Sequence, residues 1–369
     1  RSRLQQATNP QIELTNAYNT MYYAPVYTGS DNQKLSVVYD TGSDWLVLED
    51  SECESCFGQN FNTTTSSSFN QLSDIVEDRL YGSAALKGTR VTDKVCLNAD
   101  NEECVPIFEW FLIESQTGLP SDIDGILGMC LGLPIDGIDY EAGPLYVDGL
   151  KNSSIIDERT FSFFMADNPT QSFIDFGEPR DAAMSNPDDL IYVPLVKHFF
   201  WLGIWTGVRF GEDSSRAYGY SDSPAIYDTG SSLLYVGQSQ SDAFFHELTK
   251  DQVAEYYSGF YLTSCDKTPW PTVHFLTANS TWMAVEPSTY LLNAQGDDTE
   301  GADAGICIIG IVPNAADYWL VGDVFLRGFY SVHRMDDMTI GFVPHQGSTK
   351  PRLSDQGTFP EQTLSIPYN

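Results

Sequence analysis

Two copies of the segment Tyr-Asp-Thr-Gly-Ser, at 39–43 and 227–231, carry the residues of this sequence that are best suited to chemistry. In each copy an apolar run leads into the Asp, and the Gly two residues later permits the backbone of a tight turn. A single Asp-Thr-Gly is most simply a turn between strands. Two copies in related halves of one chain would instead bring Asp40 and Asp228 face to face at a pseudo-twofold axis.

Paired carboxyl groups have a definite chemistry. Two of them in contact hold one proton over a range of acidic pH, because ionising both at short distance is costly. The ionised member can act as general base on a bound water while the protonated member polarises a carbonyl group. We therefore expect hydrolysis of an amide bond without a covalent intermediate, and we predict neither a metal nor another cofactor.

A second repeated motif indicates that the whole architecture is duplicated. A triplet of two apolar residues and a Gly follows each Asp, and the triplets end at Gly128 and Gly322. The first ends 88 positions after Asp40 (128 − 40), and the second ends 94 positions after Asp228 (322 − 228). Two ordered motif pairs at similar spacing predict two copies of one fold.

Most of the chain has the pattern of β-strands. Short apolar, aromatic or β-branched runs are separated by clusters of Gly, Asn, Asp and Ser. The clearest runs are Leu35–Tyr39, Trp45–Leu48, Ile107–Ile113, Phe161–Met165, Ile191–Leu195 and Ile340–Val343. The best helical pattern is at Ser239–Thr249. We predict an all-β fold with an N-terminal lobe at 1–183 and a C-terminal lobe, with a polar tail, at 184–369.

The charge balance is strongly acidic. The chain has 51 Asp and Glu residues against 19 Lys and Arg, which gives a net charge of −32 at pH 7. Such a surface repels phosphate backbones, so we exclude nucleic acid as a partner. Solubility alone would explain the acidity; the paired Asp residues favour a protein that works where carboxylates are protonated. The sequence has no apolar run long enough to span a bilayer.

Three Asn-x-Ser/Thr sequons favour the secretory pathway and a secreted, vacuolar or lysosomal location. They predict glycosylation at Asn62, Asn152 and Asn279.

The seven Cys residues point the same way, because six of them form apparent local pairs. The pairs are Cys53 with Cys56, Cys96 with Cys104, and Cys265 with Cys307. Cys130 is left over, and we expect it to be a buried free thiol. A zinc site built on Cys53-x-x-Cys56 is the alternative, but no second C-x-x-C and no close His pair supports it.

These residues resemble the pepsin family of aspartic proteases, from about Ile12 to about Pro344. The two Asp-Thr-Gly-Ser motifs and their later triplets carry the likeness, and the segments 319–327 and 340–344 are similar to the family's C-terminal motifs. The resemblance implies a bilobal β-barrel fold with a flap over a central cleft. It also implies an endopeptidase active at acidic pH. The dyad of aspartic proteases is a well-known pair of coupled carboxyl groups.

The resemblance also assigns roles to the two repeated segments. Asp40 and Asp228 would be the catalytic dyad. The supporting residues would be Thr41, Gly42 and Ser43 in the first turn and Thr229, Gly230 and Ser231 in the second. In these turns the Ser hydroxyls would hydrogen-bond the carboxylates from outside, and the Thr side chains would brace the two loops beneath the dyad.

A flap residue and a specificity pocket follow from the same likeness. Tyr81-Gly82-Ser83 occupies the place of the flap, so Tyr81 would close over the substrate and exclude water. Apolar walls of the substrate pocket would come from Phe108, Phe111 and Leu112. A position in the core is the equal alternative for these three residues. If they line the pocket, cleavage should favour bulky hydrophobic residues at the scissile bond.

One position departs from the family pattern. The family commonly has a Trp seven residues after the first catalytic Asp, bonded to the flap Tyr, whereas this chain has Val47 there and a Trp at position 45. Side chains two apart on a strand share a face, so Trp45 is a candidate to support Tyr81 instead. The resemblance further implies a zymogen with a basic prosegment, inhibition by pepstatin-type compounds, peptide or unfolded protein substrates, and a monomer.

Three other classes of function fit the sequence less well than an aspartic protease. A pepsin-like fold kept as a binding protein or inhibitor usually loses an Asp or distorts an Asp-Thr-Gly turn, and here both turns are intact. A carboxylate-pair glycosidase would not need identical turns around both acids. A Ser-His hydrolase lacks its Gly-x-Ser-x-Gly elbow here.

Overall fold

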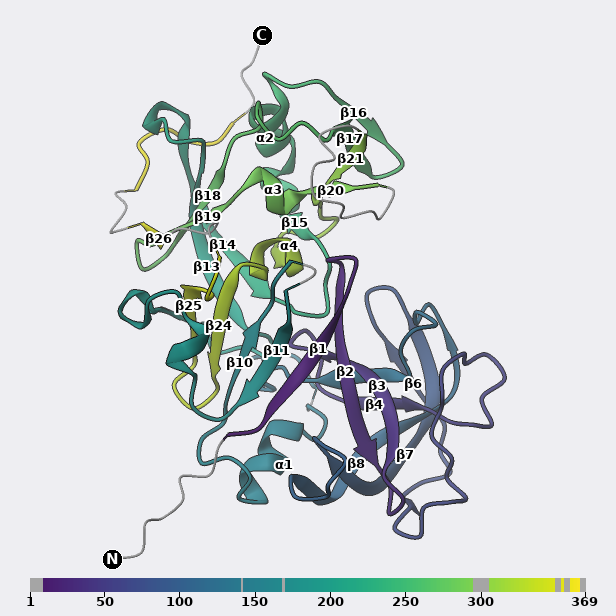
Figure 1. Ribbon diagram of the computed structural model, residues 1–369. Helices are drawn as coiled ribbons and strands as arrows, with labels where there is room; N and C mark the ends of the chain where they lie inside the picture. The colour runs from purple at the N-terminus through teal and green to yellow at the C-terminus, as the bar shows by residue number, and fades with distance from the viewer. Residues whose placement is uncertain are drawn as a thin grey trace, which may run out of the picture.

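The computed structural model describes residues 9–140, 142–167, 170–294, 305–348, 353–354 and 359–365. Strands dominate and helices are few, which confirms the predicted all-β class. Figure 1 shows two lobes, one drawn mainly in purple and blue and the other mainly in green, with β1, β10, β11, β24 and β25 between them. The fold is therefore the bilobal pepsin-like arrangement.

The strands and helices have the following bounds. In the first half the strands are β1 Gln11–Ala17, β2 Met21–Thr28, β3 Gln33–Asp40, β4 Leu46–Glu49, β5 Asn70–Gln71, β6 Glu77–Leu80, β7 Ala85–Cys96, β8 Cys104–Thr117, β9 Gly125–Gly128, β10 Thr160–Phe164 and β11 Ser172–Phe176. In the second half they are β12 Ile191–Pro194, β13 Leu202–Phe210, β14 Ala217–Tyr227, β15 Leu234–Val236, β16 Ala254–Tyr257, β17 Phe260–Ser264, β18 Val273–Thr277, β19 Trp282–Val285, β20 Leu291–Asn293, β21 Ile306–Ile309, β22 Ile311–Pro313, β23 Trp319–Val321, β24 Phe329–Arg334, β25 Thr339–Pro344 and β26 Leu353–Ser354. The α-helices are α1 Tyr146–Asn152, α2 Gln238–Thr249, α3 Pro287–Tyr290 and α4 Asp323–Leu326, and short 3-10 turns lie at Asp181–Ala183, Pro187–Asp189 and Ser214–Arg216.

These strands form three sheets. The largest has the order β12-β25-β24-β10-β11-β1-β2-β3-β9-β4-β8-β7-β5, with β6 paired to β7. A second sheet has the order β22-β15-β23-β14-β13-β18-β19-β26, and a third the order β16-β17-β21-β20. The largest sheet takes strands from both sides of the lobe boundary predicted at 183/184, because β12, β24 and β25 extend the edge formed by β10 and β11.

The two halves repeat one local arrangement around the Asp turns. In the first half β3 runs parallel to β9, and its last residue, Asp40, pairs with Gly128. In the second half β14 runs parallel to β23, with Tyr227 opposite Val321. The register therefore brings each Asp turn beside the Gly that ends its apolar triplet, and the same arrangement occurs in both halves.

Both of these triplet glycines are required by close backbone approach. A Cβ on Gly128 would lie 2.6 Å from the backbone nitrogen of Asp44. A Cβ on Gly322 would overlap the carbonyl oxygen of Ser231. Since any larger residue would push the Asp turn away from its partner strand, the Gly of each triplet sets the position of the carboxyl group.

Aromatic side chains fill the core between the lobes. On β10 Phe161 stacks on His333 of β24, with ring centroids 4.8 Å apart and an interplanar angle of 9°. The ring of Trp201 meets the same His edge-on at 4.8 Å, and its indole N–H donates to the carbonyl of Met129, next to the first triplet. These rings therefore pack next to the first triplet and its Asp turn.

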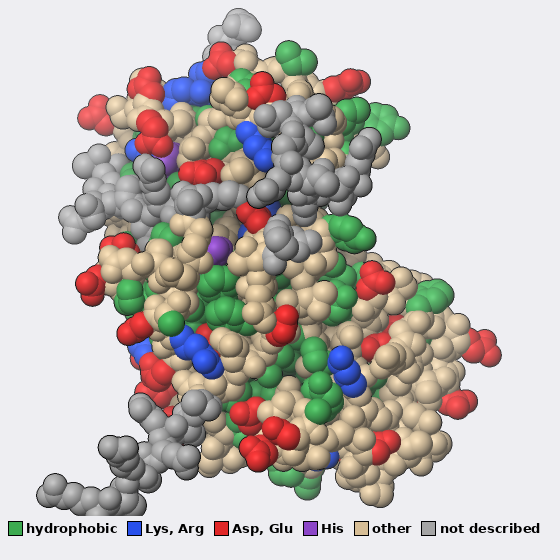
Figure 2. All heavy atoms as spheres, viewed as in Figure 1, with side chains coloured by type: hydrophobic (Ala, Val, Ile, Leu, Met, Phe, Trp, Pro, Cys, Tyr) green, Lys and Arg blue, Asp and Glu red, His purple; other side chains and the backbone are tan. Residues whose placement is uncertain are grey.

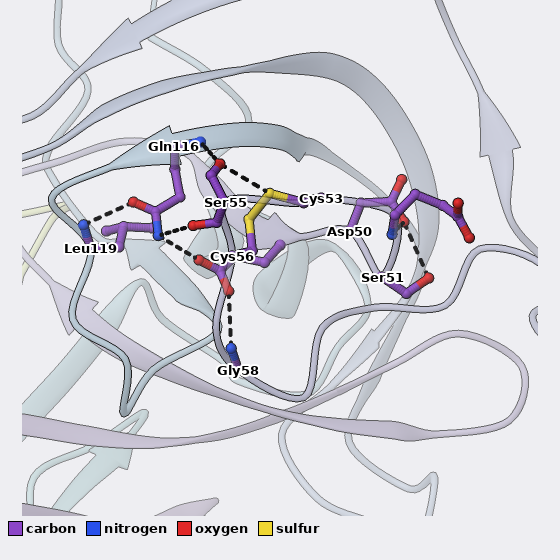
Figure 3. Close-up of a disulfide and its surroundings, with 10 residues drawn as sticks. Asp50, Ser51, Cys53, Ser55, Cys56, Gly58, Gln116 and Leu119 are labelled. Atoms are coloured by element: carbon purple, nitrogen blue, oxygen red, sulfur yellow. Dashed lines mark hydrogen bonds between the residues drawn. A yellow bond between two sulfur atoms is a disulfide. The ribbon is translucent and has the colours of Figure 1, made fainter.

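Three disulfides join the pairs expected from the sequence. They are Cys53–Cys56, Cys96–Cys104 and Cys265–Cys307. Figure 3 shows how the first loop is attached to β8: the backbone N–H of Gln116 donates to the Ser55 hydroxyl at 2.9 Å, and the Gln116 amide donates to the Ser55 carbonyl. Cys130 is a buried free thiol.

The surface carries the acidic charge. Acidic side chains are spread over both lobes on the face shown in Figure 2. Of the sequon residues, Asn152 and Asn279 are exposed and Asn62 is half-buried. No helix in the described part of the chain is long and apolar enough to cross a membrane.

Candidate active site

The two Asp carboxyl groups are held in matching nets of hydrogen bonds. Asp40 accepts from the N–H of Gly42 at 2.8 Å and from the Ser43 hydroxyl at 2.5 Å. Asp228 accepts equivalent bonds from the second turn, where the N–H of Gly230 lies at 2.9 Å and the Ser231 hydroxyl at 2.7 Å. The Asp side chains are therefore fixed by their own turns, since each accepts one backbone and one hydroxyl donor.

The turns also cross over each other. A Cβ on Gly42 would lie 2.5 Å from an oxygen of Asp228, and a Cβ on Gly230 would overlap the carboxylate of Asp40. Each carboxylate thus packs against the glycine of the opposite turn. Only Gly leaves room for this contact, and the two carboxyl groups consequently lie together.

A reciprocal pair of Thr hydrogen bonds locks the turns beneath the carboxylates. The N–H of Thr41 donates to the Thr229 hydroxyl at 3.0 Å, and the N–H of Thr229 donates to the Thr41 hydroxyl at 2.9 Å. Each hydroxyl then donates to a carbonyl across the interface, Thr41 to Tyr227 at 3.0 Å and Thr229 to Tyr39 at 2.6 Å. Both side chains are buried, so these bonds are shielded from water.

This environment alters the acidity of the pair. Burial raises the pKa of Asp40 well above its ordinary value of 3.8, and the charge of Asp228 and a hydrogen bond between the two carboxyl groups raise it further. The bonds from Ser43 and Gly42 oppose the shift. The dominant causes agree with two carboxyl groups that share a proton. The exposed fractions of Asp40 and Asp228 are only 7% and 8%.

The predicted flap is a β-hairpin. Strands β6 and β7 pair antiparallel up to Leu80 and Ala85, and the N–H of Tyr81 donates to the carbonyl of Ala84 at 2.8 Å. The segment Tyr81-Gly82-Ser83 is therefore the tip. Burial raises the pKa of Tyr81, and the charge of Asp40 raises it further. The phenol thus lies within electrostatic reach of the first Asp.

The cluster around Tyr81 contains Trp45, the candidate for flap support, together with Val47. Trp45 and Val47 are buried in the same apolar cluster, and Tyr81 packs against it. The guanidinium group of Arg79 lies over the ring of Trp45, with its carbon 3.9 Å from the ring centroid. Trp45 is therefore linked to the flap strand through a cation.

The three predicted pocket walls have different surroundings. Phe111 lies in the cluster against which Tyr81 packs. Phe108 and Leu112 lie in the main core, where Phe108 meets the ring of Tyr146 at 5.2 Å. The alternation of β8 accounts for the difference, because 108 and 112 share one face of the strand and 111 points to the other. Only Phe111 is placed on the side of the flap.

Sequence reasoning missed a third buried carboxyl group, Asp323. It directly follows the second triplet, and its N–H donates to the carbonyl of Ser231 at 2.8 Å. Burial raises its pKa well above the ordinary value; the charge of Asp228 adds to the shift and that of Arg327 opposes it. The position immediately after the triplet was the available signal, because the register makes that residue a neighbour of the Asp turn.

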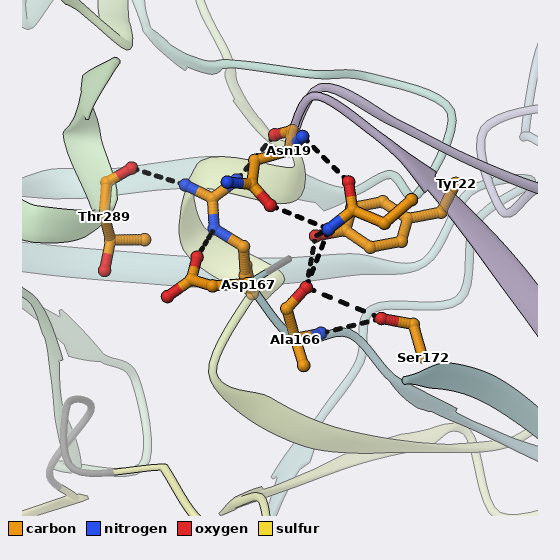
Figure 4. A network of polar contacts seen from close by, with 8 residues as sticks. Asn19, Tyr22, Ala166, Asp167, Ser172 and Thr289 are labelled. Atoms are coloured by element: carbon orange, nitrogen blue, oxygen red, sulfur yellow. Dashed lines mark hydrogen bonds and ion pairs between the residues drawn. The ribbon is translucent and has the colours of Figure 1, made fainter. Parts of the chain in front are cut away.

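Arg327 is in turn fixed by three partners. It pairs with Asp167 at 2.8 Å and donates to the carbonyl groups of Asn19 and Thr289 (Figure 4). These contacts join the β1–β2 turn, the segment after β10 and helix α3 behind Asp323. The positive charge next to Asp323 is therefore held in place by the fold.

The described residues contain no group of three or more His, Cys, Asp or Glu side chains placed to hold a metal ion. The site brings two carboxyl groups together, and such a pair can supply a general acid and a general base. A duplicated β fold with two crossed Asp turns defines a pepsin-like hydrolase with a pair of carboxyl groups.

Comparison with known proteins gives the family. The family model described as "Eukaryotic aspartyl protease" matches residues 21–345. Gastricsin of Oryctolagus cuniculus is 31% identical over 334 residues, covering 87% of this chain and 81% of the relative. Cathepsin E of Rattus norvegicus is 27% identical, covering 90% and 81%, and plasmepsin IV of Plasmodium falciparum (isolate 3D7) is 26% identical, covering 91% and 72%. The chain belongs to the eukaryotic aspartyl protease family and is an aspartic endopeptidase.

Proposed function

We propose that Asp40 and Asp228 are the catalytic dyad of this endopeptidase and that it works at acidic pH. The observation that carries the proposal is the crossed arrangement of the turns, in which the glycine of each packs on the carboxylate of the other. Burial and the charge of Asp228 raise the pKa of Asp40, which supports one proton shared by the pair. The ionised member of the pair is then the general base, and the protonated member is the general acid.

The reaction follows from these protonation states. The ionised carboxylate of the pair takes a proton from a water whose oxygen forms a bond to the scissile carbonyl carbon, and the protonated member gives its proton to the carbonyl oxygen. The resulting tetrahedral intermediate is not covalently attached to the enzyme. The C–N bond then breaks, the nitrogen takes the proton that the general base received from the water, and one hydroxyl proton of the intermediate passes to the general acid, which restores the starting state of the pair. A peptide bond and one water are consumed, and a carboxylic acid and an amine are formed.

Substrate selection is assigned to the flap side of the site. We propose that Tyr81, Gly82 and Ser83 close over the peptide, and that Phe111, whose ring is fully buried, lies behind an apolar wall near the scissile bond. An apolar wall there favours bulky hydrophobic residues in the substrate. Phe108 and Leu112 support this wall from the core side of the same strand.

The remaining properties are proposed on the sequence and on the family. They are a secreted, vacuolar or lysosomal location, glycosylation at the three sequon residues, a zymogen with a basic prosegment, inhibition by pepstatin-type compounds, and a monomer of two lobes divided near residue 183. The acidic surface supports the acidic compartment, because protonation there relieves its self-repulsion.

The experiment is digestion of an unfolded protein at mildly acidic pH by the parent and by Asp228→Asn. We expect cleavage by the parent, blocked by pepstatin, and loss of about 10³-fold or more in the variant, on the scale of removing a general base and its charge. Mapped cleavage sites should carry bulky hydrophobic residues beside the scissile bond. A folded parent without activity would instead support a binding or inhibitory protein.

A further inference from the structure

Arg79 is a cation built into the flap. It lies on β6, two residues before Tyr81, so the two side chains point to the same side of the hairpin. Its guanidinium carbon lies 3.9 Å from the ring centroid of Trp45 and 4.6 Å from that of Phe111. The Arg79 side chain is only 14% exposed. The cation is therefore enclosed between two aromatic rings.

The polar contacts of this guanidinium are few for a buried cation. One nitrogen, Nη2, pairs with Glu77 at 3.0 Å, and Nε is buried without a hydrogen-bond partner among the described residues. Burying a charge is costly unless it is compensated. The rings of Trp45 and Phe111 provide that compensation, because a cation–π contact is stronger when the cation is shielded from water.

Trp45 is a fixed platform attached to the first Asp turn. Gly143 lies directly against its indole ring, where a Cβ would overlap the ring. The neighbouring Asp44 carboxylate accepts from the Tyr140 hydroxyl at 2.8 Å and from the N–H of Gly143 at 2.7 Å. Because Trp45 is five residues after Asp40, a group bound to its ring is held at a set position relative to the dyad.

We propose that Arg79 is a positioning residue for peptide hydrolysis: by inserting between Trp45 and Phe111 it holds the flap so that Tyr81 stays over the dyad. This inference rests on the proposed function. In the family pattern a Trp at position 47 supports the flap. In this chain the cation–π contact of Arg79 takes over that support. Arg79 itself touches neither the substrate nor the reacting atoms.

The test compares Arg79→Leu and Arg79→Lys with a matched control, Arg90→Leu. Arg90 also faces the Trp45 ring, but at 5.7 Å and with a side chain that is 43% exposed. Both Leu variants remove one positive charge near the same ring. We expect Arg79→Leu to lower kcat/KM about tenfold or more, mainly through a raised KM, and to weaken pepstatin binding in parallel, since about 1.4 kcal/mol corresponds to tenfold.

A second readout does not depend on turnover. Hydrogen exchange of the backbone at 77–85 should be faster in Arg79→Leu than in Arg90→Leu, at unchanged melting temperature. Arg79→Lys should recover part of the lost kcat/KM, because it keeps the cation but not the planar group. Combining Arg79→Leu with Trp45→Leu should add little to either single change, because both remove one contact.

Several outcomes would overturn the inference. Equal kinetics and exchange in Arg79→Leu and Arg90→Leu, or full additivity with Trp45→Leu, would show that Arg79 does not position the flap. These results are distinct from failure of the proposed function, which would appear as a parent whose activity is absent or survives Asp228→Asn. If Arg79→Leu does not fold, the exchange and kinetics of Arg79→Lys decide, and parent-like values there would reject the role.

Discussion

At the scale of single residues, the orientation of the dyad is set by donors that belong to its own turns. Each carboxylate accepts one backbone N–H and one Ser hydroxyl on its outer side. The inner sides then face each other. Charge-assisted bonds of this kind are shorter and stronger than neutral ones, so each carboxyl group is held in a fixed orientation within the pair.

The Thr pair gives a prediction at this scale. Thr41→Val removes the acceptor of the Thr229 N–H and the donor to the Tyr227 carbonyl, and both groups stay buried. Leaving a buried polar group unsatisfied costs about 1–3 kcal/mol. We expect the free energy of unfolding, from urea denaturation in mild acid, to fall by about that amount, with a loss of kcat as the turns separate.

The control keeps the hydroxyl. Thr41→Ser should lose much less stability than Thr41→Val, because only the methyl group is removed. If the Ser and Val variants were equally unstable, packing rather than the reciprocal hydrogen bonds would hold the turns together.

At the scale of elements, the central strands contain a histidine that opposes stability in acid. His333 on β24 is fully buried against Phe161, and burial lowers its pKa from 6.5 to about 3. Between pH 6.5 and about pH 3 the unfolded chain therefore binds a proton at His333 that the native state does not bind. The stability contributed by the neutral ring is present above pH 6.5 and is lost progressively as the pH falls toward 3.

His333→Phe should remove this penalty. We expect the variant to gain about 2–3 kcal/mol relative to the parent when the pH falls from 6.5 to 4, measured as the difference in free energy of unfolding at the two pH values. His246→Phe, at an exposed site of α2, controls for the change of residue type. If the free energies of unfolding of His333→Phe and the parent differed by the same amount at both pH values, His333 would not be the cause of the loss of stability in acid.

The elements around the site differ in how far the sequence predicts them. The strands at 35–39 and 340–343 and the helix at 239–249 follow from local periodicity, and all three are present. The duplicated motifs also predict two copies of one architecture, and the parallel pairing of an Asp strand with its triplet occurs in both copies. These features depend on residues that are close together or repeated.

The contacts of side chains that are distant in the sequence were not predictable in the same way. The sequence left Phe108 and Phe111 equivalent, and only the register of β8 assigns them to opposite sides. Trp45 was a candidate for flap support, but its link through Arg79 depends on how β6 lies over the turn. Asp323 becomes a neighbour of Asp228 only through the parallel pairing of β14 with β23.

At the scale of the whole molecule, the acidic composition predicts a pH-dependent stability. The net charge is −32 at neutral pH. The excess carboxylates repel one another more in the compact native state than in the expanded unfolded chain. Lowering the pH protonates carboxylates and relieves this repulsion, so the native state gains stability. His333 acts in the opposite direction, but it is one group against 51 acidic residues.

We therefore expect the melting temperature to be higher at about pH 5 than at about pH 7.5 at low ionic strength, with a smaller difference in high salt, which screens exposed charges. Differential scanning calorimetry in matched buffers measures this. A melting temperature that is equal or higher at neutral pH would show that self-repulsion of the acidic surface does not control the stability of the native state.

The most direct test of the central claim is the pH dependence of kcat/KM on one peptide for the parent, Asp40→Asn and Asp228→Asn. Two carboxyl groups that share one proton should give the parent a bell-shaped profile in the acidic range, bounded by two macroscopic pKa values of the pair. Both variants should lose activity at every pH, because neither a lone acid nor a lone base completes the reaction. A profile with a single titration, or an Asn variant that retains substantial activity, would contradict a catalytic dyad of Asp40 and Asp228.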